Sequence, residues 1–470
     1  MSRVHIIGSG PNGLACAAVL ARAGVGVTVY EAASTIGGGT RSIDLTGQGL
    51  IHDVCSAAHP MAVASPVFLE LDLEAQGLEW CFPEIDLAHP LDGGRAGVMV
   101  RDIQQTAAGL GEDGKAWSKL FGPPSRAFPK LSGDINQPII HFPEHPFSLA
   151  RFGIPSLAPA TTLAKGFNTE EGKALFGGVA AHSFSPLTRL MSSAVGMALI
   201  CAAHANGWPV AKGGSQSIAN ALAAVITENG GTIETGRLIK SIDELPAGEP
   251  VIFDTSPAGV VGLAGHRMPE GVRKAFQRYE YGPAAFKLDL AVEGGIPWEN
   301  EAARKAGTVH VIGSFEELVA AEHEINYGRM PERPFLLVGQ QYLADPSRSE
   351  GDLHPVWAYA HVPNGFTGDA SEAMIAQIER FAPGFRDRIR GETAMFPDDF
   401  AQYNANYVGG DIVAGANNPR QLIFRPRATL DPYKVGEGMW ICSAATPPGG
   451  GVHGMGGANA ARSVLRSLSH

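Results

Sequence analysis

The spacing of apolar positions predicts alternating strands and helices at the start of the chain. Residues 4–7 form a short apolar run, the length expected for one buried parallel strand. A helix should follow, because small and apolar side chains recur at i, i+3, i+4 and i+7, at Leu14, Ala17, Ala18 and Ala21. Gly24 is placed to end this helix, and residues 25–30 predict a second strand.

The same pattern returns between residues 209 and 254. Ser215 is expected to cap a helix whose apolar positions are Ile218, Leu222, Val225 and Ile226. Strands are expected at residues 232–235, 238–242 and 251–254. We assign this block to the same domain as the first strands.

The remaining segments predict a second domain that interrupts the first. Residues 72–206 are short segments rich in proline and aromatic side chains. Strands are expected at 286–292, 309–312, 335–341 and 356–362, then a helix over 369–382 with Asp369 and Glu372 as its capping box. A strand at 439–442 and a final helix, with Ala458, Ala461, Leu465 and Leu468 facing inward, return the chain to the first domain.

The predicted fold class is therefore α/β. A doubly wound domain is expected from residues 1–71, 207–270 and 400–470. An interleaved substrate domain of mixed-sheet α+β type is expected from residues 72–206 and 271–399.

Composition narrows the class of protein. A chain of 470 residues is too long for one ordinary domain, and its 44% hydrophobic and 18% charged content is typical of a soluble globular protein. The net charge of −11 argues against nucleic acid as a partner, while leaving room for peripheral membrane contact through a local basic patch. The most apolar run, residues 192–203, is too short to be a transmembrane segment.

The cysteines and the N-terminus favour a cytoplasmic protein. The five cysteines are scattered and form no C-x-x-C pair, so neither a zinc site nor a dithiol is indicated. Buried thiols in a reducing compartment are the simplest interpretation. The first strand begins so close to Met1 that we expect no signal peptide.

A glycine-rich turn after the first strand indicates a nucleotide site. Gly8, Gly10 and Gly13 fit the G-x-G-x-x-G spacing, and the residues between the last two are Pro11 and Asn12. The glycines permit a tight turn, close approach of backbone amides to a pyrophosphate, and close packing of the helix on the strand. Glu31 ends the second strand about 20 residues later, where a carboxylate accepts hydrogen bonds from both ribose hydroxyls of an adenosine. This combination is typical of a Rossmann-like unit.

Two further glycine-rich segments indicate more contacts with a cofactor. Gly38, Gly39 and Thr40 precede Arg41, a candidate partner of the pyrophosphate. Near the C-terminus, Gly450, Gly451, Val452 and His453 precede the final helix. The free amides and the positive dipole of that helix would stabilise an anion such as the N1–C2=O edge of a reduced flavin.

Together these motifs resemble those of the phytoene desaturase-like flavoproteins. The resemblance includes the helix beginning after Pro209-Val210-Ala211-Lys212-Gly213-Gly214. Residues 396–412 and 421–426 indicate one branch of this family. They are similar to the branch that includes pyridine nucleotide-disulfide oxidoreductase domain-containing protein 2. The similarity runs essentially from end to end.

The resemblance implies FAD bound between the two domains. It places the first three glycines at the pyrophosphate, Glu31 at the adenosine ribose, and residues 38–41 at the ribityl-pyrophosphate region. Leu238 takes the place of the residue whose backbone receives the adenine, and residues 450–453 lie by the isoalloxazine. Two departures stand out. Ser443-Ala444-Ala445-Thr446-Pro447-Pro448 replaces the usual Gly-x-Gly-x-His-Pro, and His453 replaces a proline common in the desaturases proper, which argues against a carotenoid substrate.

The predicted function is an FAD-dependent oxidoreductase that abstracts hydride from a C–H bond of a small organic, lipophilic substrate and passes electrons to oxygen or a quinone. Two alternatives remain open: a non-catalytic lipid- or prenyl-binding protein on the same scaffold, and an NAD-dependent dehydrogenase. His453 either donates a proton or fills space, and His361 is either a core or a catalytic histidine. No metal-ligand cluster is readable in the sequence.

Overall fold

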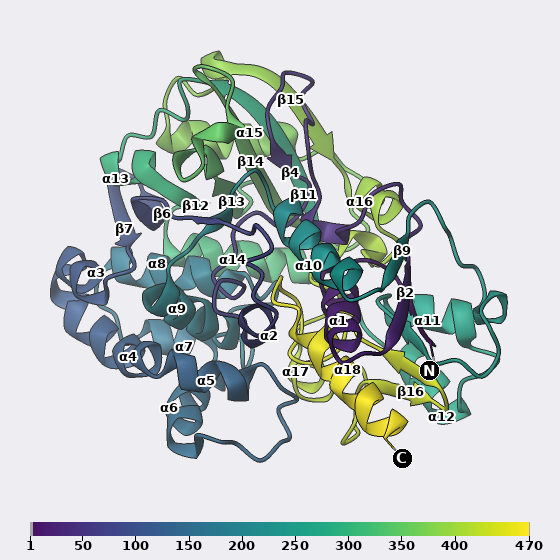
Figure 1. The fold of residues 1–470 in the computed structure, drawn as a ribbon. Coiled ribbons are helices and arrows are strands. Elements are labelled where there is room, and N and C mark those ends of the chain that lie inside the picture. Colours follow the sequence, from purple (N-terminus) through teal and green to yellow (C-terminus); the bar gives the residue numbers. More distant parts are fainter. Residues whose placement is uncertain (1–2, 470) are drawn as a thin grey trace.

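Two large sheets organise the computed structural model, which describes residues 3–469 (Figure 1). The first sheet has the strand order β16-β17-β10-β1-β2-β9. Its strands are β1 (Arg3–Ile7), β2 (Gly26–Tyr30), β9 (Thr232–Glu234), β10 (Val251–Phe253), β16 (Lys434–Gly436) and β17 (Met439–Ile441). All neighbouring pairs are parallel except β16 with β17. The strands predicted at residues 4–7, 25–30, 232–235, 251–254 and 439–442 thus lie in one doubly wound sheet.

Helices cover both faces of this sheet, which explains why its strands are short apolar runs. On one face α1 (Pro11–Arg22) contacts α10 (Gln216–Glu228) and α18 (Met455–Leu468). The close approach of α18 requires glycine, because a Cβ at Gly457 would overlap the carbonyl oxygen of Asn12. On the other face α11 (Pro257–Ala264) and α12 (Glu270–Gln277) pack side chains against Phe253 and Ile441.

The second sheet is mixed and has the strand order β15-β11-β14-β13-β12-β6-β7. Its strands are β6 (Ile85–Leu91), β7 (Arg95–Met99), β11 (Ala284–Glu293), β12 (Ala306–Val311), β13 (Leu336–Gly339), β14 (Leu353–Val362) and β15 (Ile389–Met395). The pair β12 with β6 is parallel, and the other neighbouring pairs are antiparallel. The predicted α/β class and the mixed sheet are confirmed.

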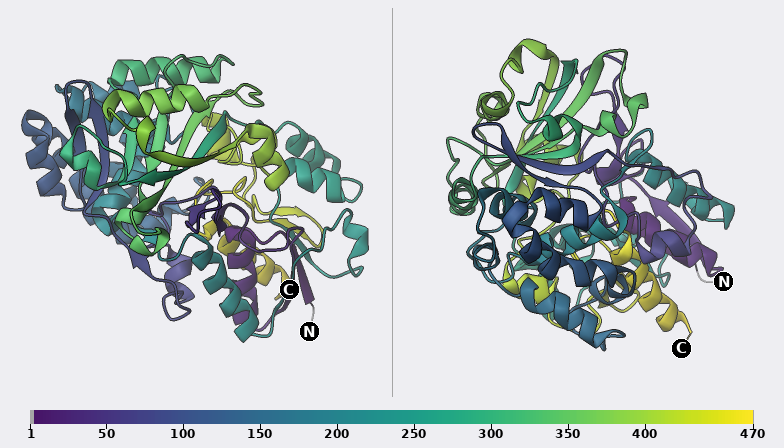
Figure 2. Two further views of the ribbon diagram at one scale, coloured as in Figure 1. Left: turned by 90° about the horizontal axis from the view of Figure 1, so that it is seen from above. Right: turned by 90° about the vertical axis from the view of Figure 1, so that its left-hand side faces the viewer.

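A layer of helices packs on the second sheet (Figure 2). It comprises α3 (Ile103–Gly109), α4 (Gly114–Arg126), α5 (Phe128–Ile135), α6 (Pro146–Ser156), α7 (Ala160–Ala164), α8 (Glu170–Ala181) and α9 (Ala194–Asn206). Aromatic side chains fill its core, among them Trp117, Phe121 and Phe176. The proline- and aromatic-rich residues 72–206 therefore form mostly helices, which the sequence did not indicate.

Shorter elements complete the chain. Two-stranded ladders join β3 (Ser42–Ile43) to β4 (His52–Asp53) and β5 (Trp80–Cys81) to β8 (Val210–Ala211). The remaining α-helices are α2 (Pro66–Glu70), α13 (Glu301–Lys305), α14 (Phe315–Asn326), α15 (Ser371–Phe381), α16 (Pro397–Tyr403) and α17 (Pro419–Phe424).

Three local predictions are wrong. Residues 238–241 form no strand, and a 3-10 helix (Ile242–Glu244) follows them. Ser215 does not cap α10 with its side chain, because its Oγ donates to the carbonyl of Ser56. Helix α15 begins after Ala370 without a capping box, because Glu372 pairs with Arg386 instead. In each case a tertiary partner or a loop replaced a purely local interaction.

Candidate functional site

A cavity of about 760 Å³ lies where the carboxyl ends of the first sheet's strands meet the second sheet. Such a crevice is the expected ligand site of an open α/β sheet. Most of the predicted cofactor residues line it, from chain segments far apart in sequence: Gly8, Gly10, Pro11, Asn12, Glu31, Gly38, Gly39, Arg41, Leu238, Gly450, Gly451 and Val452. Gly13, Thr40 and His453 lie behind this wall and do not line the cavity.

The turn after β1 needs glycine at each fingerprint position. Gly8 has a φ of +103°, which L side chains rarely adopt. A Cβ at Gly10 would lie 2.6 Å from Oδ2 of Asp254, and one at Gly13 would lie 2.7 Å from the same oxygen. The glycines thus make room for a buried carboxylate from the end of β10 as well as for a ligand.

Asp254 caps the first helix from a neighbouring strand. The Gly13 N–H donates to its Oδ2 over 3.0 Å. Burial raises the pKa of Asp254 to about 6, Glu31 also raises it, and the Gly13 amide opposes the shift. Helix α1 has no acidic residue in its first turn and no side-chain cap on Gly10, so its positive end faces the cavity beside this carboxyl.

Glu31 is held in place before any ligand binds. Its Oε2 accepts from the Ser9 N–H at 3.1 Å and from the Ser9 hydroxyl at 2.5 Å, and its Oε1 accepts from the Ala33 N–H at 2.8 Å. Arg41 Nη2 lies 3.3 Å from Oε1. The carboxylate is therefore oriented by backbone and side-chain donors at the rim of the cavity.

Arg41 is a buried cation on the cavity wall. Its Nε and Nη2 donate to the Thr35 carbonyl, and its guanidinium lies 5.2 Å from the centre of the Tyr403 ring. The Tyr403 hydroxyl in turn donates to the Gly38 carbonyl over 2.6 Å. Tyr403 and Tyr407 both line the cavity, and the sequence did not single them out. Only their place on the segment that folds back over Gly38 and Gly39 brings them there.

The C-terminal glycine segment faces the cavity, but His453 does not. Gly450, Gly451 and Val452 line the cavity before the chain turns inward. His453 is 3% exposed, its Nδ1 accepts from the Met455 N–H at 3.1 Å, and its carbonyl accepts from the Ser65 hydroxyl. Burial lowers the pKa of His453 to about 4, so its imidazole is neutral at pH 7.

Ser443, where the resembled family has glycine, and the following Ala444 also line the cavity. Ser443 Oγ accepts from the Ala445 N–H over 3.3 Å, so its polar atom is engaged within its own turn.

The second sheet gives the far end of the cavity an apolar, aromatic wall. Trp357 and Tyr359 on β14 pack edge to face at 4.9 Å and line it with Leu337 of β13 and Trp208. Trp357, Tyr359 and His361 alternate along β14 and therefore share one face of the sheet. His361 of the same face lies outside the cavity wall, where its Nδ1 pairs with Glu322 Oε1 at 2.7 Å.

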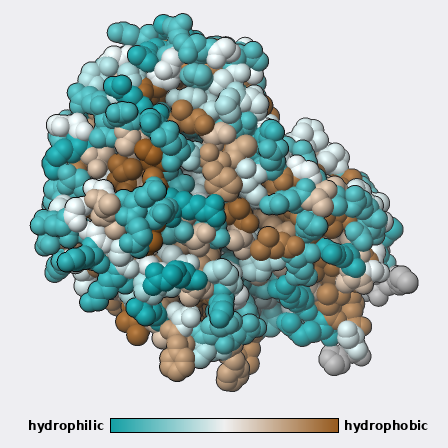
Figure 3. All heavy atoms as spheres, turned by 60° about the vertical axis from the view of Figure 1, so that its left-hand side comes forward, coloured by the Kyte–Doolittle hydropathy of each residue, from teal (hydrophilic) through white to brown (hydrophobic). Residues whose placement is uncertain are grey.

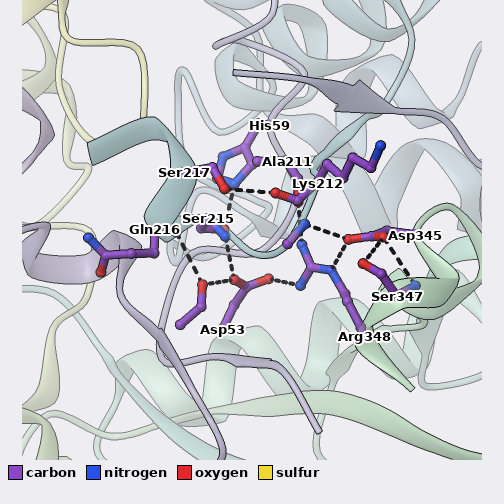
Figure 4. A network of polar contacts seen from close by, with 12 residues as sticks. Asp53, His59, Ala211, Lys212, Ser215, Gln216, Ser217, Asp345, Ser347 and Arg348 are labelled. Carbon is purple, nitrogen blue, oxygen red and sulfur yellow. Dashed lines mark hydrogen bonds and ion pairs between the residues drawn. The ribbon is translucent and has the colours of Figure 1, made fainter. Parts of the chain in front are cut away.

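A buried ion network fixes the segments around the cavity (Figure 4). Arg348 Nη1 pairs with Asp53 Oδ2 at 2.6 Å and its Nε with Asp345 Oδ2 at 3.2 Å, all three side chains being at most 2% exposed. Arg348 also donates to the Ala211 carbonyl, and the Gly213 N–H donates to Asp345. The Pro209–Gly214 motif thus serves as an anchor for α10.

Within residues 3–469, no cluster of three or more His, Cys, Asp or Glu side chains is arranged to hold a metal ion. Over the same range, no helix has the length and apolar character needed to cross a membrane.

Comparison with known proteins agrees with this geometry. The NAD(P)-binding Rossmann-like domain family matches residues 6–69. Pyridine nucleotide-disulfide oxidoreductase domain-containing protein 2 of Rattus norvegicus is 22% identical, over 99% of this chain and 93% of its own. The putative oxidoreductase AegA of Escherichia coli is 69% identical over 36 residues, 8% of this chain and 6% of its own.

Solved structures share the whole fold. An oxidoreductase from Methanosarcina mazei has a TM-score of 0.63 at 16% identity, covering 99% of this chain and 100% of its own. Putrescine oxidase has a TM-score of 0.63 at 16% identity, covering 100% of this chain and 99% of its own. Cyclohexylamine oxidase from Brevibacterium oxydans has a TM-score of 0.58 at 16% identity, covering 100% of both chains.

The resemblance to pyridine nucleotide-disulfide oxidoreductase domain-containing protein 2 that the sequence indicates is therefore confirmed: the chain is distantly similar to that protein over nearly its whole length, and it carries an NAD(P)-binding Rossmann-like domain.

Proposed function

We propose that the protein is an FAD-dependent oxidoreductase that removes hydride from a C–H bond of a small, lipophilic organic molecule. The observation that carries the proposal is one continuous cavity with two chemically different ends. One end is formed by the glycine turn, Glu31 and Arg41, and the other by Trp357, Tyr359 and Leu337.

The residues present fit FAD. Beside the Gly13 amide, which Asp254 caps, the N-terminus of α1 directs its positive dipole toward the position of a pyrophosphate. A Cβ at Gly38 would lie 3.1 Å from Gly10 Cα, so two glycine segments converge where a ligand must approach backbone. Glu31 would bind the adenosine ribose, Leu238 would lie at the adenine, and residues 450–452 would lie at the isoalloxazine.

When bound, FAD supplies the hydride acceptor, and the chain supplies binding and orientation. The aromatic end excludes water and holds an apolar molecule against the cofactor position. We keep the division into a cofactor domain (1–71, 207–270, 400–470) and a substrate domain (72–206, 271–399) as part of this proposal, and oxygen or a quinone as the electron acceptor.

An absorbance spectrum of the purified protein tests the cofactor. We expect a flavin spectrum, with FAD released by acid because the attachment is non-covalent. Anaerobic addition of apolar alcohols or amines should bleach it, and air or a soluble quinone should restore it. A colourless protein that binds lipid would favour the non-catalytic scaffold protein, and a colourless protein that binds NADH would favour the dehydrogenase.

Peripheral contact with a lipid surface is a second part of the proposal. Around α6, Phe142, Phe147 and Ile154 are 100%, 92% and 71% exposed. Figure 3, which brings this side forward, shows apolar side chains protruding at the lower edge between hydrophilic ones. Arg151, within α6, and Lys165, after α7, are exposed cations that complement anionic headgroups. Co-sedimentation with anionic vesicles should be lost in a Phe142→Ser/Phe147→Ser variant, and unchanged binding would contradict the contact.

A further inference from the structure

One amide side chain lies on the apolar wall of the cavity without a hydrogen-bond partner. Gln341 begins the 3-10 helix that follows β13, lines the cavity and is 4% exposed. Within residues 3–469 its amide bonds to no other residue, whereas the amide of the preceding Gln340 bonds to Trp298 and to two carbonyl groups. The Gln341 amide is also absent from the unpaired polar atoms that the protein encloses completely, so it keeps surface open to the cavity.

The amide lies on the face of the second sheet that forms this wall. Gly339 is directly opposite Thr308 of β12 and Trp357 of β14, and directly opposed residues point to the same face of a sheet. Both partners line the cavity. A Cβ at Gly339 would overlap Nε2 of Gln341 and would lie 3.1 Å from Cε3 of Trp357. The missing side chain of Gly339 therefore leaves the space that the Gln341 amide occupies, on the cavity side of the sheet and against the indole.

The cavity-lining residues around this amide are uncharged. The acids and bases that line the cavity, apart from one histidine, are Glu31, Arg41, Arg237 and Asp254, which lie at the cofactor end. The histidine is His182, and burial lowers its pKa to about 3, so it is neutral at pH 7. A charged ligand group would find no countercharge at the aromatic end, whereas a neutral oxygen could bond to the amide.

We propose that Gln341 is a specificity-determining residue whose amide selects uncharged, largely apolar molecules that carry one carbonyl or hydroxyl oxygen. A pure hydrocarbon lying on this wall would remove water from the amide without replacing its hydrogen bond. A carbonyl oxygen accepts from the amide N–H, and a hydroxyl group can bond to either amide atom. The inference rests on the proposed function and names its substrate class.

Calorimetry with two ligands of the same shape tests the selection on the purified, oxidised protein. Acetophenone and α-methylstyrene differ only in having C=O or C=CH2, and both are uncharged. Gln341→Met should raise the ratio of the acetophenone dissociation constant to the α-methylstyrene dissociation constant about 3- to 10-fold, the range expected for one net hydrogen bond.

Thr308→Val is the matched control for this measurement. It removes a neighbouring hydroxyl group from the same wall with little change of shape, and it should leave the ratio of the two dissociation constants unchanged. An unchanged ratio in Gln341→Met, or an equal shift in Thr308→Val, would overturn the proposal.

Infrared spectroscopy of the wild type makes a second test that needs no variant. The C=O stretch of bound, isotope-labelled acetophenone should lie below its value in an apolar solvent, because a hydrogen bond weakens the C=O bond. A stretch at the apolar-solvent value would overturn the proposal even if Gln341→Met failed to fold. A colourless protein that shows both effects would overturn only the proposed oxidoreductase function, and a flavoprotein that shows neither would overturn only the role of Gln341.

Discussion

At the scale of single residues, the missing side chains of the glycine turn leave room for two groups, a ligand and the carboxyl of Asp254. The fingerprint explains why side chains are absent where a pyrophosphate must approach. The structure adds that the missing side chain of Gly10 also makes room for the carboxyl of Asp254, which is needed to cap α1.

Gly10→Val should therefore abolish flavin binding and loosen the start of α1, because its Cβ would displace Asp254. The absorbance ratio of flavin to protein after purification measures the loss. Gly26→Val in the neighbouring strand is the control, since its Cβ would meet nothing within 4 Å. Full flavin content in the Gly10 variant would remove the support for this site.

Asp254 should make the unloaded protein less stable as the pH rises. Its folded-state pKa of about 6 exceeds the usual 3.8, so the folded chain binds this proton more tightly than the unfolded chain. The resulting stability is complete below about pH 4 and is lost as the pH rises through about 6, a difference of about 3 kcal/mol.

Asp254→Asn should remove this pH dependence and strengthen FAD binding at pH 8, because a negative charge beside the pyrophosphate position disappears. Urea unfolding of apoprotein at pH 5 and pH 8, and flavin titration at pH 8, measure the two effects. A variant with the same pH dependence as the wild type would show that Asp254 is charged in both states.

At the scale of elements, the buried network of Asp53, Arg348 and Asp345 joins β4, the start of α10 and the loop after β13. Arg348→Met should lower the free energy of unfolding by about 3–5 kcal/mol, because two buried carboxylates lose the cation that pairs with both of them. Chemical denaturation measures the change. Lys212→Met, which breaks an exposed pair with Glu79, should leave the denaturation midpoint unchanged. Equal effects of the two substitutions would contradict the anchoring role.

The position of His453 in the structure differs from the position that its motif predicts. The motif places it at the flavin, whereas its side chain caps its own turn and lies behind the cavity wall. Its role as a proton donor stays a prediction, and this packing favours a space-filling role.

At the scale of the whole molecule, the structure contains one dinucleotide fingerprint within residues 3–469. The segment Val309–Phe315 begins like a second, but β12 belongs to the mixed sheet and Gly313 is followed by the capping box of α14. NADH and NADPH should therefore fail to bleach the loaded protein at ordinary turnover rates, about 10 per second. Stopped-flow absorbance measures this, and bleaching at that rate would require a nicotinamide site.

The sequence by itself determined the elements whose information is local. Periodicity located β1, α1, β2 and α18, because burying one face of a helix or both faces of a strand leaves a repeating apolar pattern. The fingerprint and Glu31 fixed one end of the cavity, because their spacing is set by a single strand–helix–strand unit.

The tertiary structure alone decided which distant residues meet. Asp254 beside Gly10, Tyr407 beside Gly39 and His310 beside His182 are separated by more than 100 residues, and no local pattern encodes such pairs. It also directed the Ser215 hydroxyl to the Ser56 carbonyl and paired Glu372 with Arg386, whereas Asp369 still accepts from the Ser371 N–H. Local propensities are worth about 1 kcal/mol each, whereas burial of the assembled core decides the final contacts.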